Sequence, residues 1–256
     1  MVVAGLAGEH YRAMDGPDGP DGPPIVIVHG AMDRAAGFRR TARHLPDRDI
    51  VAYDRRGYSG SRDLPLAERL SDHVDDLMRV CEELAAAGQR RLLVGHSAGG
   101  LIALHALARP GVAELVLGAV VWEPPLAWKD WYASRSNRLL DLAPETAAEQ
   151  FLRAVVGDRL WERLPSAMRA DRLAEGPALV SDMRNARDPS SDVDLALVHL
   201  PVVAGYGTES SEEHRRSAVE VADGIDGARL VAIEGAGHGI HLDRPRAFAE
   251  LIASWG

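Results

Sequence analysis

The chain has 256 residues, of which 46% are hydrophobic and 26% charged, a composition that suits one large globular domain. Its 38 acidic residues outnumber the 29 lysines and arginines, which gives a formal net charge of −9. A surface of this sign repels nucleic acid and anionic membranes, so neither is expected as a partner. The single cysteine excludes an intrachain disulfide, and no apolar run is long enough to cross a bilayer. These features predict a cytoplasmic protein.

Short apolar runs alternate with helical patterns over the first half of the chain. The strand-like runs have no polar interruption, as expected of strands buried on both faces. The helical patterns have apolar residues at helical spacing and end before Gly or Pro. This order favours right-handed βαβ crossovers and a mainly parallel sheet. Strands are predicted at 25–28, 50–53, 92–94 and 114–121, and helices at about 70–87 and 98–108.

A turn-forming triplet, Asp-Gly-Pro, occurs three times before the first of these strands, within residues 15–24. Gly permits positive φ, Pro fixes φ, and Asp can cap its own turn. We therefore expect an extended turn between two strands there, with no part in any chemistry.

The alternation stops between about 124 and 199, where aliphatic and aromatic residues recur at helical spacings. Breaks at Pro144, Gly157, Pro165 and Gly176 divide this segment into several short helices. The sequence therefore predicts a core domain interrupted by a helical insertion. After the insertion, strands are predicted at 202–204 and 230–233 and helices at about 211–222 and 244–254; the core is 1–123 and 200–256, and the insertion 124–199.

A G-x-S-x-G pattern, Gly95-His96-Ser97-Ala98-Gly99, lies directly after the predicted strand at 92–94 and directly before a helix. In this setting a serine sits on a turn so sharp that its backbone is strained. Side chains at the flanking positions would collide, and glycines avoid this. The turn lifts the hydroxyl clear of the sheet and aims the first amides of the helix at the reaction centre. The pattern predicts a nucleophilic serine.

Four separated motifs occur in the order found in the α/β-hydrolase family, which the chain resembles over nearly its full length. They are His29-Gly30, the turn from Asp54 to Ser61, the elbow at 95–99, and Gly235-Ala236-Gly237-His238. The resemblance implies an α/β fold with a mainly parallel sheet flanked by helices. It also implies that the insertion is a helical lid and that the charged turn at 54–61 is structural.

The resemblance implies a role for each motif residue. Ser97 is the nucleophile and His238 its base, because a serine hydroxyl cannot attack unaided and imidazole titrates near neutral pH. His241 is a nearby competitor for the role of base. The backbone N–H groups of Ala31 and Ala98 are expected to form the oxyanion hole.

The acid that orients the base is open between two glutamates. The usual family position, after the seventh strand, falls on Thr208 or Ser210, and neither can serve. Glu209 lies beside them. Glu123 ends the sixth strand, where some members of the family place the acid, and a Pro-Pro pair stiffens the backbone after it. We favour Glu123 over Glu209, and a Ser-His dyad without an acid is the alternative.

Aromatic residues gather in or beside the insertion and are expected to line a small apolar pocket, although they could equally pack short helices on the sheet. We expect hydrolysis of a small, hydrophobic ester or lactone through an acyl-enzyme on Ser97. Two alternatives are non-hydrolytic chemistry (lyase, acyl transfer or cyclase) on the same scaffold, and a low-turnover ligand-binding protein. No cluster has metal-ligand spacing and no phosphate loop occurs, so neither metal nor cofactor is expected. The aromatic residues are Trp122, Trp128, Trp131, Tyr132 and Trp161.

Overall fold

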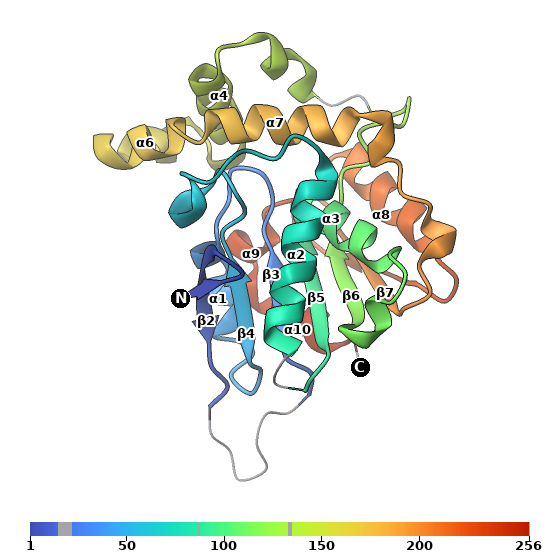
Figure 1. Cartoon of the computed structure of the whole chain (residues 1–256). Helices are drawn as coiled ribbons and strands as arrows, with labels where there is room; N and C mark the ends of the chain where they lie inside the picture. The colour runs from blue at the N-terminus through green and yellow to red at the C-terminus, as the bar shows by residue number, and fades with distance from the viewer. Residues whose placement is uncertain (15–21, 86–87, 133–134, 256) are drawn as a thin grey trace.

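A computed structural model describes residues 1–14, 22–85, 88–132 and 135–255. Residues 15–21, which hold most of the Asp-Gly-Pro repeat, lie outside the described residues. Within the described part of the chain an eight-stranded sheet has the order β1-β2-β4-β3-β5-β6-β7-β8 (Figure 1). The strands are β1 (Val2–Val3), β2 (Leu6–Tyr11), β3 (Ile25–Val28), β4 (Ile50–Tyr53), β5 (Arg91–His96), β6 (Val116–Trp122), β7 (Val202–Gly207) and β8 (Arg229–Ile233).

The sheet is parallel from β4 to β8 and antiparallel only at its N-terminal edge, where β1 pairs with β2 and β2 with β4. Every residue of β3, β4 and β5 is buried, in agreement with the uninterrupted apolar sequences of β3, β4 and residues 92–94 of β5. The six strands predicted from the sequence are all present, and the mainly parallel sheet is confirmed.

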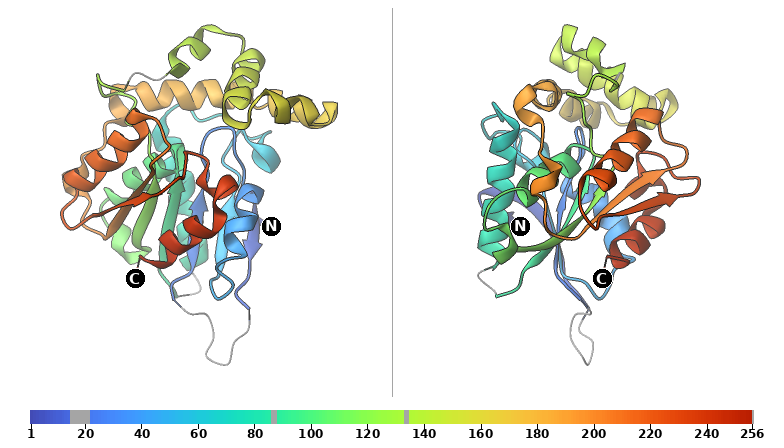
Figure 2. Two further views of the ribbon diagram at one scale, coloured as in Figure 1. Left: turned by 180° about the vertical axis from the view of Figure 1, so that it is seen from behind. Right: turned by 90° about the vertical axis from the view of Figure 1, so that its right-hand side faces the viewer.

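Helices cover both faces of the sheet (Figures 1 and 2). Side chains from α2, α3 and α8 pack in one apolar cluster against the sheet, and side chains from α1, α9 and α10 pack in a second. None of the described helices is both long and apolar enough to span a bilayer. The flanking helices are α1 (Arg39–Ala42), α2 (Leu70–Ala85), α3 (Ala98–Leu107), α8 (Glu212–Gly224), α9 (Ile240–Asp243) and α10 (Pro245–Ala253).

The segment between β6 and β7 is helical and lies across the carboxyl end of the sheet (Figure 1). Its boundaries follow the expected breaks: α4 begins at Pro144 and stops at Gly157, whose φ is 79°, and α7 begins at Gly176. The segment contains the α-helices α4 (Pro144–Val156), α5 (Asp158–Arg163), α6 (Ser166–Leu173) and α7 (Gly176–Arg187), and the 3₁₀-helices η4 (Arg135–Asp141), η5 (Pro189–Ser191) and η6 (Leu195–Leu197).

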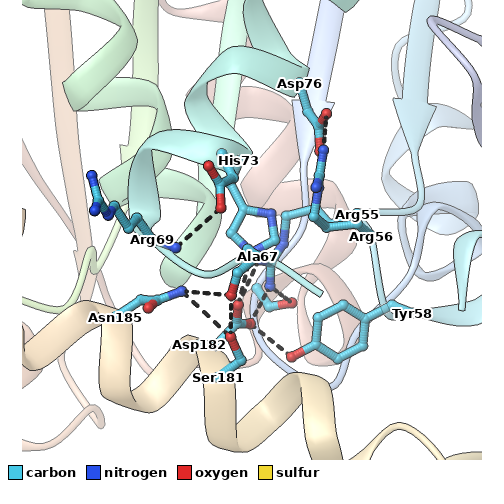
Figure 3. Close-up of polar contacts among 12 residues, drawn as sticks. Arg55, Arg56, Tyr58, Ala67, Arg69, His73, Asp76, Ser181, Asp182 and Asn185 are labelled. Carbon is cyan, nitrogen blue, oxygen red and sulfur yellow. Dashed lines mark hydrogen bonds and ion pairs between the residues drawn. The ribbon is translucent and has the colours of Figure 1, made fainter. Parts of the chain in front are cut away.

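A buried polar network ties α7 to the core (Figure 3). Arg55, in the turn after β4, is fully buried and forms two hydrogen bonds to Asp182 of α7, at 3.0 and 2.6 Å. The Tyr58 hydroxyl donates to the same carboxylate at 2.7 Å, and His73 Nε2 lies 3.1 Å from it. The Arg55 guanidinium holds the pKa of Asp182 well below its usual range despite burial. The charged turn therefore anchors α7 above the sheet.

Candidate active site

Ser97 occupies the turn between β5 and α3 with φ 53° and ψ −123°, a backbone conformation that L-residues seldom adopt. Its N–H donates to the carbonyl oxygen of Trp122 on β6 at 2.8 Å. A Cβ on Gly95 would lie 2.5 Å from the Cα of Gly100, and one on Gly99 would lie 2.0 Å from the carbonyl oxygen of Val28. Only glycine fits at either position, so this sequence is required for the turn.

The two residues expected to supply oxyanion-hole amides are Ala98 and Ala31. Ala98 is the first residue of α3, so its N–H has no acceptor within the helix. Ala31 follows His29-Gly30 in the loop after β3 and lines the same cavity as Ser97. Backbone amides in this setting can stabilise negative charge that develops next to the serine.

Glu123 directly follows β6 and contacts His238, 115 residues further along the chain. Its Oε2 accepts a hydrogen bond from His238 Nδ1 at 2.6 Å, and its Oε1 accepts one from the N–H of Gly207 at 2.8 Å. The carboxylate is fully buried, and its φ of 47° is left-handed. Glu209, in contrast, is exposed. Of the two glutamates, the structure brings Glu123 to the histidine.

The backbone of His238 is fixed as well as its ring. Its carbonyl oxygen accepts hydrogen bonds from His96 Nε2 at 2.8 Å and from Trp122 Nε1 at 3.1 Å. Burial, with a smaller contribution from the charge of His241, lowers the pKa of His238 to about 4. The imidazole is therefore neutral at neutral pH and able to accept a proton.

His214 of α8 is a site residue that the sequence did not reveal. Its ring stacks on that of His238, with centroids 4.0 Å apart and an interplanar angle of 10°. Its Nδ1 lies 3.7 Å from Glu123 Oε2, and burial lowers its pKa to about 3. A helical pattern predicts which face His214 occupies, but it cannot predict a ring stacked on a residue 24 positions away.

A cavity of about 310 Å³ opens beside Ser97 and His238, both of which line it. Its wall is mainly apolar, and most of the apolar lining residues come from the insertion, among them Phe151 and Leu152 of α4, Trp161 of α5 and Met168 of α6. A site of this size and character suits a small apolar ligand.

Of the five aromatic residues expected to line the pocket, Trp161 does so in the described structure. Trp122 is fully buried beneath the site, where it supports His238. Trp128 and Trp131 pack against the core cluster of α2, α3 and α8, and Tyr132 lies near His214, 6.4 Å between ring centroids. Trp122 belongs to the core strand β6. The other three lie outside the wall because the start of the insertion runs past α8, whereas the wall comes from its later helices.

One part of the cavity wall is polar. Arg34 and Arg172 both line it, and both contact the buried carboxylate of Glu175, at 3.1 and 2.6 Å. Arg172 also donates to the carbonyl oxygen of Met32, and burial lowers the pKa of its guanidinium. This part of the wall presents two guanidiniums, whose charge is balanced by the carboxylates of Glu175 and Asp33.

Comparison with known proteins agrees with this geometry. A family model described as the alpha/beta hydrolase family matches residues 25–251. The chain belongs to the alpha/beta hydrolase family. It is an α/β-fold hydrolase, and the family membership expected from the motifs is confirmed.

Individual relatives within the alpha/beta hydrolase family are distant. A 2-succinyl-6-hydroxy-2,4-cyclohexadiene-1-carboxylate synthase from Serratia proteamaculans is 28% identical over 253 residues, which cover 90% of this chain and 92% of the relative. An enol-lactonase from Burkholderia xenovorans superposes with a TM-score of 0.73 at 19% identity, covering 98% and 95% of the two chains. A thermophilic esterase from Thermogutta terrifontis superposes with a TM-score of 0.74 at 20% identity, covering 98% of this chain and 92% of the esterase. At these identities, the two structural similarities show that the fold is shared and no more.

Proposed function

We propose that this chain hydrolyses small, hydrophobic esters or lactones through an acyl-enzyme on Ser97. The observation that carries the proposal is the contact of Glu123 with His238 at 2.6 Å, on a histidine that lines the same cavity as Ser97. A nucleophile, a base and an acid that orients the base are the groups that acyl transfer requires.

In the proposed reaction, Ser97 Oγ attacks the substrate carbonyl carbon while His238 takes the hydroxyl proton. Glu123 holds the Nδ1–H of His238 and favours the imidazolium that forms. The N–H groups of Ala31 and Ala98 bind the developing oxyanion. His238 then gives its proton to the leaving alcohol oxygen, and a water molecule activated by the same histidine releases the acid.

Residues 124–199 serve in this proposal as a lid on the core of 1–123 and 200–256. The helices α4, α5 and α6 supply the apolar wall, whereas the Arg55–Asp182 network holds α7 in place. The small apolar cavity supports short acyl groups or small rings as substrates. The similarity in fold to an esterase and an enol-lactonase agrees with this substrate class.

A second candidate reaction is an elimination on the same residues. Two observations favour it: the 28% identity to a 2-succinyl-6-hydroxy-2,4-cyclohexadiene-1-carboxylate synthase, and the guanidiniums of Arg34 and Arg172 in the cavity wall. These guanidiniums could bind a substrate carboxylate while His238 removes a proton from carbon. The C–H electron pair then forms the new double bond, and the leaving group departs with its own bonding pair.

The test of the proposal is covalent labelling followed by product analysis. A fluorophosphonate should modify the parent once, and Ser97→Ala should remain unlabelled; labelling of that variant at the parent's rate would refute the nucleophile. Turnover of p-nitrophenyl butyrate in H₂¹⁸O should place ¹⁸O in the butyrate released. A parent that is labelled at Ser97 but releases no acid from esters would favour the elimination.

A further inference from the structure

A second group of ionisable side chains lies in the wall of the cavity, apart from the Glu123–His238 pair. Asp33 follows β3, His96 ends β5, and His241 belongs to the short helix α9. All three line the cavity. His241 Nε2 lies 3.0 Å from Asp33 Oδ2, and the rings of His96 and His241 meet edge to face, 4.5 Å between centroids. One nitrogen or oxygen atom from each residue lies within 4.8 Å of the other two.

The free atoms of this group are electron-pair donors. His96 Nε2 donates its proton to the carbonyl oxygen of His238, so the lone pair of the neutral ring is on Nδ1. That Nδ1 is buried and has no hydrogen-bond partner among the described residues. Burial also lowers the pKa of His96 well below its ordinary value, which keeps the lone pair available.

His241 and Asp33 form an ion pair beside this nitrogen, with His241 Nε2 3.0 Å from Asp33 Oδ2. The other ring nitrogen of His241, Nδ1, has no hydrogen-bond partner in the described structure, although the side chain is only 3% exposed. Asp33 Oδ1 accepts from the N–H of Arg34. A buried polar atom without a partner is costly, so the bare Nδ1 of His96 next to this ion pair indicates a site for a ligand.

We propose that Asp33, His96 and His241 bind a divalent transition-metal ion of the Zn²⁺ class in the cavity wall. Two imidazoles and one carboxylate form a donor set that Zn²⁺ accepts, whereas Mg²⁺ and Ca²⁺ prefer oxygen alone. Bond lengths of about 2.0–2.2 Å require the three donor atoms to close around the ion, a small rotation for side chains already this near. Phe38 stacks on the His241 ring at 4.6 Å and holds it in orientation.

Binding of the ion has a consequence for catalysis, and that consequence rests on the proposed function. The ion and its water would occupy part of a 310 Å³ cavity directly beside Ser97, where the acyl group must lie. The ion therefore acts as an inhibitor that competes with substrate. Positions 33, 96 and 241 have no metal-site spacing along the chain, which is why the sequence led us to expect no metal.

Equilibrium dialysis against ZnCl₂ tests the binding without any assay of activity. The parent should bind one equivalent, and Asp33→Asn and His241→Gln should each weaken binding at least tenfold. Zn²⁺ should also raise the Tm of the parent but not that of Asp33→Asn, a readout that shows both proteins to be folded. His10→Gln, which alters an exposed histidine 2.8 Å from Asp49, should bind as the parent does.

One further control separates this site from the other group that could hold an ion, Glu123, His214 and His238. His214→Gln should leave zinc binding unchanged. No binding to the parent, or binding lost in His214→Gln and retained in both Asp33→Asn and His241→Gln, would overturn the proposal.

Kinetics test the consequence separately. Saturating Zn²⁺ should raise KM of the parent for p-nitrophenyl butyrate at least tenfold at constant kcat. The same Zn²⁺ concentration should leave the KM of Asp33→Asn nearly unchanged. A fall in kcat at constant KM would overturn the competition. If the parent shows no esterase activity, the proposed function fails, while dialysis still decides the metal site.

Discussion

Glu123 Oε2 accepts a hydrogen bond from Nδ1 of His238 at 2.6 Å. The Glu123 carboxylate is fully buried, and its other oxygen accepts a hydrogen bond from the N–H of Gly207. This contact orients the imidazole, and in the proposed reaction the other ring nitrogen acts as the base. Replacement of Glu123 by glutamine should reduce kcat/KM for p-nitrophenyl acetate by about 10²–10⁴-fold, since the tautomer and the imidazolium both lose their support. The matched variant Glu209→Gln removes an exposed carboxylate and should stay within about twofold of the parent. The opposite pattern would move the acid to the position after β7.

The pH dependence of the parent should reflect a depressed histidine pKa. Burial lowers the pKa of His238 to about 4, so the active neutral form persists well below the ordinary value of 6.5. As the pH falls, kcat/KM should stay constant through pH 6.5 and decline only when the imidazole is protonated. Glu123→Gln removes a charge that favours the imidazolium, so the decline should move to still lower pH. A decline centred at or above pH 6.5 in the parent would contradict this interpretation.

His214 should act by positioning the ring of His238. The two rings stack at 4.0 Å, and an aromatic replacement can keep this contact whereas a small one cannot. His214→Ala should lower kcat several-fold at nearly constant KM, and His214→Phe should restore most of the loss. Equal activity of parent and His214→Ala, measured with p-nitrophenyl acetate, would show that the stack has no such role.

The size of the cavity should depend on Trp161. This side chain lines the wall, so Trp161→Ala should enlarge the cavity and shift the preference from acetate towards longer acyl esters. Trp128→Ala is the matched control, because Trp128 packs against the core cluster instead. Comparison of kcat/KM for acetate, butyrate and hexanoate esters measures the shift. An equal shift in both variants would mean that the wall is wrongly assigned.

The buried network under α7 should contribute strongly to stability. Asp182→Ala leaves the guanidinium of Arg55 buried without its partner, a change that costs about 3–5 kcal/mol in the free energy of unfolding. Urea denaturation of the parent and the variant measures this difference in the free energy of unfolding. Asp171→Asn is the matched control, since it alters an exposed carboxylate 3.4 Å from Arg62 and should change the free energy by less than about 1 kcal/mol. A loss below about 1 kcal/mol in Asp182→Ala would show that the network does not anchor α7.

The sheet and the family could be predicted because each depends on local sequence. The run at 25–28 is apolar at every position, as a strand buried on both faces requires. Gly95 and Gly99 are required beside Ser97 because a Cβ at either position would lie 2.0–2.5 Å from the backbone of another residue. The position of Glu123 was predictable from the strand that precedes it. These signals lie within a few residues of the feature that they predict.

The rest of the site depends on contacts between distant segments, which short patterns do not encode. The stack of His214 on His238 requires the packing of α8 against the loop after β8. The lining of the cavity depends on the path of the insertion, which places Trp161 in the wall and Trp131 against α8, with Arg216 over its ring. Aromatic content alone does not indicate which tryptophan lines the cavity and which packs against α8.

The acyl-enzyme on Ser97 is tested most directly by the pre-steady-state release of p-nitrophenol from p-nitrophenyl acetate. The parent should release a burst close to one equivalent per chain before slower turnover, and Ser97→Ala should show no burst. Mass spectrometry of the acid-quenched parent should find one acetyl group on the peptide that contains Ser97. A burst of equal size in Ser97→Ala, or an acetyl group on another residue in the parent, would contradict nucleophilic attack by this serine.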